Sequence, residues 1–233
     1  MLKRSFDVVL AACGLLLFGP AIAAAACLVW LGDRSSPWYL APRCGRDGIP
    51  FRMVKLRSMR LGADRTGVNS TASDDPRVTR VGAFIRRYKL DELTQLWNVF
   101  KGEMSLVGPR PQVPSAVAVY TQTEMGMLAV RPGITDFASI VFADEGAILQ
   151  GSRDPDADYD RLIRPWKSRL ALFYVTHSSM ALDLFLIGAT FQAIVARRRA
   201  LDRVTRRLRG MGADPAVIEV ASRLKPLPPA TPA

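Results

Sequence analysis

The sequence is poor in the side chains that build thiolate or imidazole metal sites. It contains three cysteines, at positions 13, 27 and 44, with no CxxC pair, and a single histidine. A disulfide framework and a zinc site of cysteine and histidine ligands are therefore poorly supported, and a reducing compartment fits best.

Acidic residues are too few to balance the basic ones. The 233 residues include 32 Lys and Arg against 21 Asp and Glu, a formal net charge of +11. This excess predicts an anionic partner, which can be a nucleic acid, phospholipid headgroups or a phosphorylated substrate. Aromatic residues are not interleaved with the basic ones as in nucleic-acid-binding modules, so no nucleic acid is expected as a partner. The length suits one compact domain with appendages.

Charge is missing from one long stretch near the N-terminus. Residues 8–32 form a 25-residue uncharged run, which is long enough to span a bilayer as a helix. Three interpretations compete: a signal peptide cleaved near residue 26, a straight transmembrane helix, and a helix that enters the membrane, bends and returns. Pro20 removes a backbone hydrogen bond in mid-run and predicts a kink. Because the arginine-rich remainder indicates a cytoplasmic location, we expect residues 1–32 to form a re-entrant membrane helix.

The rest of the sequence predicts a mainly helical α+β fold. Segment 38–60 alternates short apolar runs with glycines and arginines, and it predicts one or two strands around a turn at 45–48. Helical spacing of apolar residues predicts helices over 78–90, 91–100, 114–129, 159–176 and 183–199. Residues 33–199 are therefore expected to form a small cytoplasmic domain with a short β element. Residues 200–233 are expected to be a basic tail, with an appended helix followed by a disordered, proline-rich end.

The predicted helix over 183–199 carries an apolar stripe on one side. Five apolar side chains recur at helical spacing, and three arginines follow them: Leu184, Ile187, Phe191, Ile194, Val195 and Arg197–Arg199. This pattern is typical of an amphipathic helix at a membrane interface, and a helix that faces a protein core gives the same pattern. Asp183 stands at the start of this helix, where it fits an N-terminal cap as well as a site residue.

Two adjacent carboxylates, Asp91 and Glu92, stand close to a dense group of basic residues, namely Arg80, Arg86, Arg87, Lys89 and Lys101. In phosphate chemistry, one carboxylate can attack phosphorus while its neighbour holds Mg²⁺, and cations stabilise the transferred group. The alternative is that both residues open a helix favourably and pair with surface arginines. Spacing alone favours this second interpretation.

Two further basic residues are candidates for a phosphate site. Arg110 lies between Pro109 and Pro111, so a stiff loop holds its guanidinium group in a way that suits bidentate phosphate binding. A loop arginine that faces solvent is the alternative. Lys55 lies on a predicted strand, where alternate residues share a face and can line a polar cleft.

Three motifs follow one another in the middle of the chain: DPRVTRVG at 75–82, DELTQLWNV at 91–99 and KGEMSLVGPRP at 101–111. With KRSFD (3–7) before them and RPGIT (131–135) after them, up to residue 184, they closely resemble the bacterial sugar transferase family. These are the monotopic polyprenyl-phosphate hexose-1-phosphate transferases of the small single-domain type. So long a set of motifs in one order is highly specific.

The resemblance implies transfer of a sugar 1-phosphate from a nucleoside diphosphate sugar, such as a UDP-sugar, to polyprenyl (undecaprenyl) phosphate. This reaction releases a nucleoside monophosphate and starts surface-glycan assembly at the cytoplasmic face of the bacterial inner membrane. In the family mechanism the residue that matches Asp91 attacks phosphorus and forms a phosphosugar intermediate, and the residue that matches Glu92 holds Mg²⁺. The motifs assign the remaining roles by position: phosphate binding to Arg86 and Arg110, the cleft to Lys55, and the break of the membrane helix to Pro20.

Several positions depart from the family pattern. Ala41 replaces a common glutamine, Thr94 replaces the proline after Asp-Glu-Leu, and Asp136-Phe137-Ala138-Ser139 replaces Gly-Trp-Ala-Gln. Asp136 and Asp183 are candidates for a sugar or nucleotide pocket. The acidic pair and Arg110 are retained, so an active enzyme is expected. The alternative is a catalytically inactive, membrane-tethered binding or scaffold protein for anionic lipid.

Overall fold

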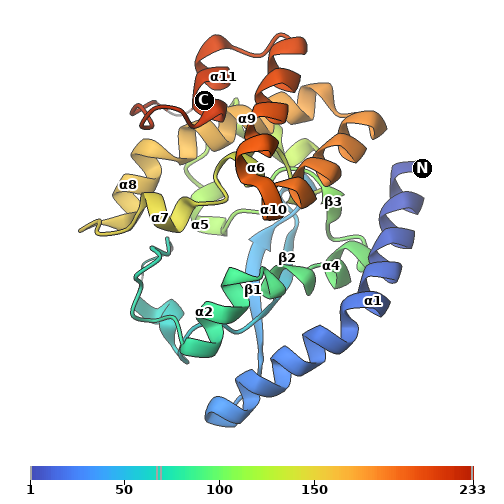
Figure 1. Cartoon of the computed structure of the whole chain (residues 1–233), viewed down its shortest axis with the longest axis vertical. Coiled ribbons are helices and arrows are strands. Elements are labelled where there is room, and N and C mark those ends of the chain that lie inside the picture. The colour runs from blue at the N-terminus through green and yellow to red at the C-terminus, as the bar shows by residue number, and fades with distance from the viewer. Residues whose placement is uncertain (1, 67, 69, 232) are drawn as a thin grey trace.

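The computed structural model describes residues 2–66, 68, 70–231 and 233. The chain is a mainly helical α+β protein with two small two-stranded sheets, as the sequence predicts. A long N-terminal helix runs along one side, and the C-terminal helices gather at the opposite end, with the β-hairpin between them (Figure 1).

The uncharged run forms one long helix, α1 (Leu2–Asp33), with Pro20 inside it. The chain stays helical on both sides of the proline, and Figure 1 shows the helix bending along its length. Much of its apolar surface faces outward, with Leu16 82% and Leu17 73% exposed. Helix α1 is one of two helices in the described residues that are long and apolar enough to cross a membrane by length and composition. The apolar N-terminal helix is confirmed, and its re-entrant course stays a prediction.

Polar side chains fix the start of α1 to the domain. Lys3 donates a hydrogen bond to the carboxylate of Asp183. Asp7 is buried and accepts a hydrogen bond of 2.8 Å from the Ser105 hydroxyl. These contacts join three segments that lie far apart in the sequence, so the beginning of the apolar helix is held in a defined position against the domain.

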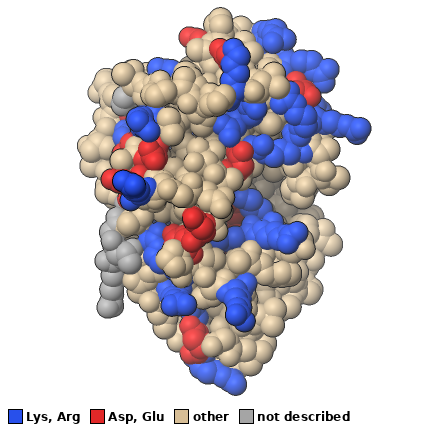
Figure 2. Space-filling model, turned by 60° about the vertical axis from the view of Figure 1, so that its left-hand side comes forward, with Lys and Arg blue, Asp and Glu red and all other residues tan. Residues whose placement is uncertain are grey.

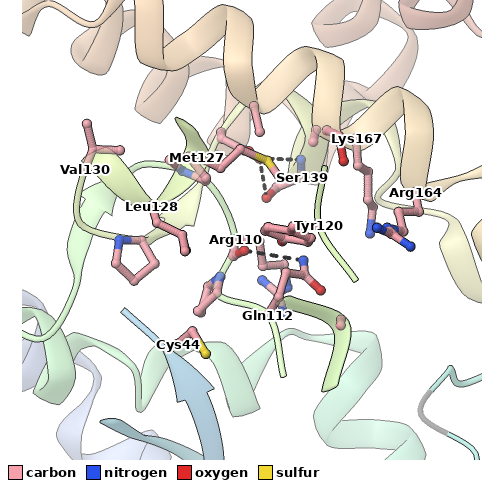
Figure 3. A pocket seen from close by; sticks show the side chains of 18 of the residues that line it. Cys44, Arg110, Gln112, Tyr120, Met127, Leu128, Val130, Ser139, Arg164 and Lys167 are labelled. Atoms are coloured by element: carbon pink, nitrogen blue, oxygen red, sulfur yellow. Dashed lines mark hydrogen bonds between the residues drawn. The ribbon is translucent and has the colours of Figure 1, made fainter. Parts of the chain in front are cut away.

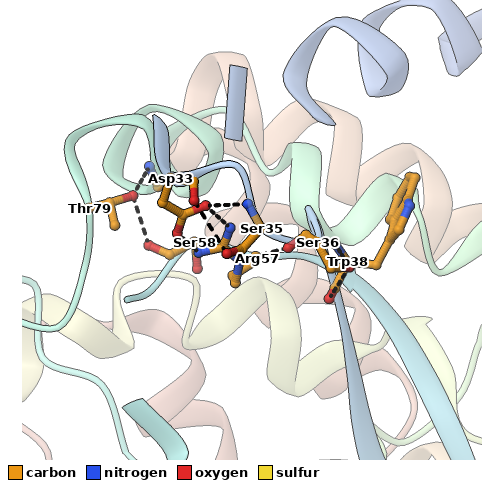
Figure 4. Close-up of polar contacts among 8 residues, drawn as sticks. Asp33, Ser35, Ser36, Trp38, Arg57, Ser58 and Thr79 are labelled. Carbon is orange, nitrogen blue, oxygen red and sulfur yellow. Dashed lines mark hydrogen bonds and ion pairs between the residues drawn. The ribbon is translucent and has the colours of Figure 1, made fainter. Parts of the chain in front are cut away.

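An ion pair fixes the other end of α1. Arg57, which is almost fully buried, binds both carboxylate oxygens of Asp33 at 2.6 and 2.7 Å, and it donates to the Ser36 carbonyl oxygen at 2.8 Å (Figure 4). Bidentate pairs of this kind restrain both groups in orientation as well as in distance. The end of α1 is therefore anchored to the residue that directly follows the strand carrying Lys55.

The predicted strands form an antiparallel hairpin, β1 (Trp38–Cys44) and β2 (Pro50–Leu56), joined through the 3-10 turn η1 (Arg46–Gly48). Tyr39 pairs with Lys55, and Arg43 pairs with Phe51. Because cross-strand partners and every second residue share a face, Arg43 and Lys55 lie on the same face of the hairpin.

Short helices follow the hairpin. After η2 (Ala63–Thr66), α2 (Arg80–Arg87) begins at Thr79, whose side chain accepts a hydrogen bond from the Gly82 amide. A Cβ atom at Gly82 would lie 1.8 Å from the Ser58 carbonyl oxygen, so only glycine allows α2 this close to the end of β2. The predicted helix over 91–100 is interrupted and forms α3 (Leu90–Leu93) and α4 (Leu96–Lys101).

A second sheet was not predicted. It consists of β3 (Ser105–Val107) and the parallel β4 (Gly133–Thr135), and strands of three residues are too short for a readable alternation. Between them the helix expected over 114–129 is wrong, because the chain forms α5 (Pro114–Val117) and the separate 3-10 helix η3 (Glu124–Ala129). A Cβ atom at Gly133 would lie 2.1 Å from the Gly108 amide nitrogen, so glycine allows the two segments to meet.

The C-terminal half is helical: α6 (Phe137–Val141), α7 (Glu145–Ile148), α8 (Pro155–Leu162), α9 (Arg164–His177), α10 (Met180–Gly210) and α11 (Pro215–Ser222). The largest hydrophobic core lies here. Leu201, Val204, Leu208 and Val217 belong to it, although the sequence sets residues 200–233 apart as a tail. The Trp166 indole also donates to the Pro228 carbonyl oxygen at 2.9 Å. The boundary expected at residue 199 therefore does not coincide with an edge of the core.

The apolar stripe of α10 faces outward. Phe191, Ile194 and Val195 are 62%, 71% and 89% exposed, whereas Leu182 and Leu186 on the other side are fully buried. The stripe is therefore not the core-facing side of the helix. The cap expected at the start of this helix is supplied by Ser179 and not by Asp183, since the Ser179 side chain accepts from the Leu182 amide.

Candidate active site

The carboxylates Asp91 and Glu92 occupy α3, which is held against strand β2. The Thr94 hydroxyl lies 2.8 Å from the carbonyl oxygens of both Val54 and Asp91. One turn further, the Asn98 side-chain amide accepts from the Val54 amide at 2.9 Å. These contacts set the acidic pair beside the strand that carries Lys55. Thr94 departs from the family pattern, and its hydroxyl supplies a contact that proline lacks.

Asp91 is a buried carboxylate, 7% exposed, whose Oδ1 atom has no hydrogen-bond partner within the described part of the chain. Burial raises the pKa of Asp91 above its ordinary value, the charge of Lys55 opposes this rise, and the neighbouring Glu92 adds to it. Such a carboxylate is poorly solvated and is not tied up by hydrogen bonds, which suits a nucleophile.

Glu92 is ion-paired with Arg110, whose Nη2 atom donates to Glu92 Oε1 at 2.9 Å. Burial on its own would raise the pKa of Glu92, but the charges of Arg110, Lys89 and Lys55 outweigh it and lower this pKa to about 2. Glu92 is therefore ionised throughout the neutral range. The stiff loop around Arg110 holds the guanidinium group against the acidic pair, so Arg110 is not a free surface residue.

Two more cations approach Asp91 from different elements. Burial, together with the charge of Arg110, lowers the pKa of Lys55 to about 8, although Asp91 and Glu92 oppose this effect. No hydrogen bond or ion pair of Lys55 is found among the residues described, so its ammonium group can meet a ligand. Arg86 donates a hydrogen bond from Nε to the Ser58 hydroxyl at 3.0 Å. Burial lowers the pKa of Arg86, and the charge of Asp91 opposes this fall.

A cleft of about 400 Å³ lies between Lys55 and Arg110 of this cluster and the C-terminal half, and Asp91, Glu92 and Arg86 are not among the residues that line it. The hairpin forms one wall, the loop around Arg110 lies at its base, and helices α8 and α9 form the opposite wall. Basic and acidic side chains meet in the hollow across the middle of the face shown in Figure 2. The charged residues and tyrosine of the lining are Arg43, Lys55, Arg110, Glu145, Asp156, Tyr159, Asp160, Arg164 and Lys167, five basic against three acidic. An anionic ligand of several phosphates fits this mixture of charges.

A smaller cavity of about 80 Å³ lies behind the cleft and shares Arg110, Tyr159, Arg164 and Lys167 with it. In Figure 3, Arg110, Gln112 and Tyr120 lie between the hairpin end at Cys44 and the helix that carries Arg164 and Lys167. Asp136 lines this inner cavity. Asp183 lines neither space, because it is buried against Lys3 and Tyr174, whose hydroxyl donates to it at 2.7 Å.

Sequence reasoning missed the far wall of the cleft. Tyr159, Arg164 and Lys167 belong to no recognised motif, and more than 45 residues separate them from Arg110. Lys167 donates to the Glu145 carboxylate, and Arg164 lies 3.1 Å from the buried Glu124. A run of polar residues on an otherwise apolar helix is the only signal in the sequence, and a solvated helix face gives the same signal.

The carboxylates of α3 are the groups that could hold a magnesium ion. Within the described ranges, no group of three or more His, Cys, Asp or Glu side chains could hold a metal ion. Asp91 and Glu92 offer two carboxylates, one of which has an unpartnered buried oxygen. Mg²⁺ commonly takes one or two carboxylates and completes its coordination shell with substrate phosphates and water.

Residues 1–197 match the sequence pattern of a family described as bacterial sugar transferase. The chain belongs to this family. It is 40% identical over 215 residues to an exopolysaccharide production protein, ExoY, of Rhizobium meliloti, an alignment that covers 85% of the chain and 87% of the relative.

Two other relatives have names that state a reaction. A UDP-glucose:undecaprenyl-phosphate glucose-1-phosphate transferase of Escherichia coli is 41% identical over 143 residues, which is 60% of the chain and 31% of the relative. A UDP-N-acetylgalactosamine-undecaprenyl-phosphate N-acetylgalactosaminephosphotransferase of Aeromonas hydrophila is 33% identical over 197 residues, covering 83% of the chain and 44% of the relative. The chain thus spans less than half the length of these two relatives.

Proposed function

We propose that this protein transfers a sugar 1-phosphate from a UDP-sugar or related nucleoside diphosphate sugar to undecaprenyl phosphate, which starts the assembly of a surface glycan. The observation that carries the proposal is Asp91, a buried carboxylate with an unpartnered oxygen, on which the charges of Lys55 and Arg110 act from the lining of the cleft. The names of the two relatives with a stated reaction, and the family itself, support the same class of activity.

The chemistry follows in two displacements at one phosphorus atom. Asp91 attacks the phosphorus that carries the sugar, the bond to the bridging oxygen breaks, and the nucleoside monophosphate leaves with the electron pair. A phosphate oxygen of undecaprenyl phosphate then attacks the same phosphorus. The bond to Asp91 breaks and regenerates the carboxylate, and the lipid now carries a diphosphate-linked sugar.

The neighbouring charges divide the supporting roles. Glu92, kept ionised by Arg110, is the group that would hold Mg²⁺, which would neutralise charge on the substrate phosphates when bound. Lys55 and Arg86 stabilise the equatorial oxygens of the transferred group from the strand side. The stiff loop around Arg110 holds its guanidinium group between the Glu92 carboxylate and the cleft.

The outer surface supports contact with a membrane, which we propose to be the bacterial inner membrane with the catalytic domain on its cytoplasmic side. Helix α4 packs against α1 and exposes Trp97 (48%) and Phe100 (41%), whose rings stack at 5.9 Å. These rings add to the exposed apolar side chains on the outward face of α1. Trp and other aromatic residues favour the membrane–water boundary. A membrane helix that bends at Pro20 and returns would place Asp91 near the level of the lipid phosphate.

A direct assay tests the proposal. Full-length protein in detergent micelles, with undecaprenyl phosphate and Mg²⁺, is screened against UDP-sugars for release of UMP. We expect turnover of at least one donor, and Asp91→Asn should abolish it. Asp47→Asn, an exposed turn residue, should retain activity. The scaffold alternative predicts salt-sensitive binding to anionic vesicles without any turnover. Full activity of Asp91→Asn would refute the proposed nucleophile.

A further inference from the structure

Asp136 presents a buried hydrogen-bond acceptor that the protein leaves unused. The residue is 1% exposed. Its Oδ1 atom caps helix α6 and accepts from the Ser139 amide and the Ser139 hydroxyl, each at 2.7 Å. The second oxygen, Oδ2, is fully buried and has no partner among the described residues.

The cap does not require this second oxygen. A single side-chain oxygen satisfies the free amide at a helix start, and serine or asparagine would serve as well as aspartate. A buried acceptor without a partner costs free energy, because the carboxylate oxygen has lost its water. Burial accordingly raises the pKa of Asp136, although the hydrogen bonds from Ser139 and the charge of Lys167 oppose the rise. The stability of the fold therefore does not explain why the cap of α6 is an aspartate, with a second carboxylate oxygen, and not a serine or an asparagine.

The position of Asp136 suggests what the free oxygen meets. Asp136 lines the inner cavity behind the cleft, together with apolar and weakly polar side chains that include Met127, Leu128 and Tyr120 (Figure 3). The cavity adjoins Arg110, which faces the acidic pair on its other side. A group that enters this cavity while its phosphates lie at Arg110 and Lys55 is thus only a short distance from the reacting phosphorus.

The size of the cavity limits the group. A space of about 80 Å³ is smaller than the roughly 150 Å³ cavity that accommodates benzene in an engineered protein core. Because Arg110, Tyr159 and Lys167 line both spaces, the part of a donor that reaches into the inner cavity from the cleft is a small one, such as a sugar substituent or the edge of a base. A carboxylate among the residues that line this cavity, Asp136, favours a part that carries an O–H or N–H group.

We propose that Asp136 is a specificity-determining residue, whose Oδ2 accepts a hydrogen bond from an O–H or N–H group of the nucleotide-sugar donor in the inner cavity. The inference rests on the proposed function, since it assigns part of the donor to this space. A site with a buried acceptor for a substrate O–H or N–H group rejects analogues that lack this group, because the acceptor then has no hydrogen-bond partner.

Two variants separate this role from the cap. Asp136→Asn keeps a capping oxygen and turns the free acceptor into an N–H₂ donor, and Asp136→Ser keeps a cap and removes the second group altogether. Asp154→Asn is the matched control, because Asp154 caps α8 in the same way through the Ala157 amide and is exposed. Thermal unfolding of each variant checks that the fold is retained.

The measurement is UMP release from UDP-glucose and UDP-N-acetylgalactosamine by the full chain, with UDP as a competing inhibitor. We expect both Asp136 variants to lose about 10-fold or more in kcat/KM for the better donor, while Asp154→Asn matches the wild type. An equal loss in UDP affinity would place the contact on the base, and unchanged UDP affinity would place it on the sugar.

Failure of this inference is distinct from failure of the proposed function. If the wild-type chain releases UMP and both folded Asp136 variants keep its kcat/KM for every donor that it uses, Asp136 is only a helix cap and the inference is overturned. If the wild-type chain turns over no donor at all, the proposed function itself has failed.

Discussion

Replacement of Arg110 by methionine should lower the free energy of unfolding at neutral pH and have less effect in acid. Arg110 lies 2.9 Å from Glu92 and is the foremost of the charges that lower the pKa of this carboxyl, from 4.5 to about 2. At 1.36 kcal/mol per pKa unit, the difference corresponds to about 3 kcal/mol. Lys89 and Lys55 share this effect, so we expect the substitution to cost about 1–2 kcal/mol at pH 7.

The sign of the pH dependence follows from the lowered pKa. Stability from a lowered carboxyl pKa is fully present above the unfolded value near 4.5, and it is lost as the pH falls from there toward 2. The gap between wild type and Arg110→Met should therefore be constant from pH 7 to about pH 5.5 and shrink below pH 4.5. Urea unfolding of both proteins in detergent at pH 3.5, 5.5 and 7 measures this difference in the free energy of unfolding.

A control identifies the source of the effect. Arg161→Met removes an exposed ion pair with Asp158, and surface pairs of this kind contribute only about 0–1 kcal/mol. This variant should change stability little at any pH. A gap for Arg110→Met that stays constant down to pH 3.5, or that does not exceed the gap of the control, would refute the electrostatic account of Glu92.

Three further predictions concern other parts of the chain. Leu208→Ala, in the segment that the sequence sets apart as a tail, should cost about 2–5 kcal/mol in urea unfolding because Leu208 is fully buried, and a cost near zero would show that the tail is not part of the core. Lys55→Met should slow UMP release and remove the fall in rate as the pH rises through about 8, where Lys55 loses its proton; an unchanged fall in the pH–rate profile would contradict this. Gly133→Ala should lower the melting temperature strongly because its Cβ would meet Gly108, whereas Gly210→Ala has open space and should not; similar melting temperatures would contradict the close strand contact.

Features encoded in neighbouring residues were predicted well. The hairpin followed from alternating short apolar runs around a glycine-rich turn at 45–48, and the structure confirms both strands. The acidic pair at the start of a helix was also predicted, since acidic residues favour a first turn. Local pattern could not decide whether Asp91 is exposed or buried, because that depends on how Thr94 and Asn98 hold α3 against β2.

Features that depend on distant partners were missed. Strands β3 and β4 have three residues each and pair across more than 25 positions, so neither strand shows a periodic pattern of its own. The wall of the cleft at Tyr159 and Lys167 is assembled by packing of α8 and α9 against the loop around Arg110. The exposed face of α10 was also undecided from sequence, because membrane-facing and core-facing stripes have the same spacing.

The central claim is that Asp91 carries the sugar phosphate between the two substrates. The most direct test is the intact mass of the protein after incubation with Mg²⁺ and a donor that it turns over, in the absence of undecaprenyl phosphate. The account predicts a mass increase equal to one sugar phosphate, located on the peptide that contains Asp91 and absent from Asp91→Asn. The same adduct on Asp91→Asn, or an adduct on another residue of the wild type, would contradict it.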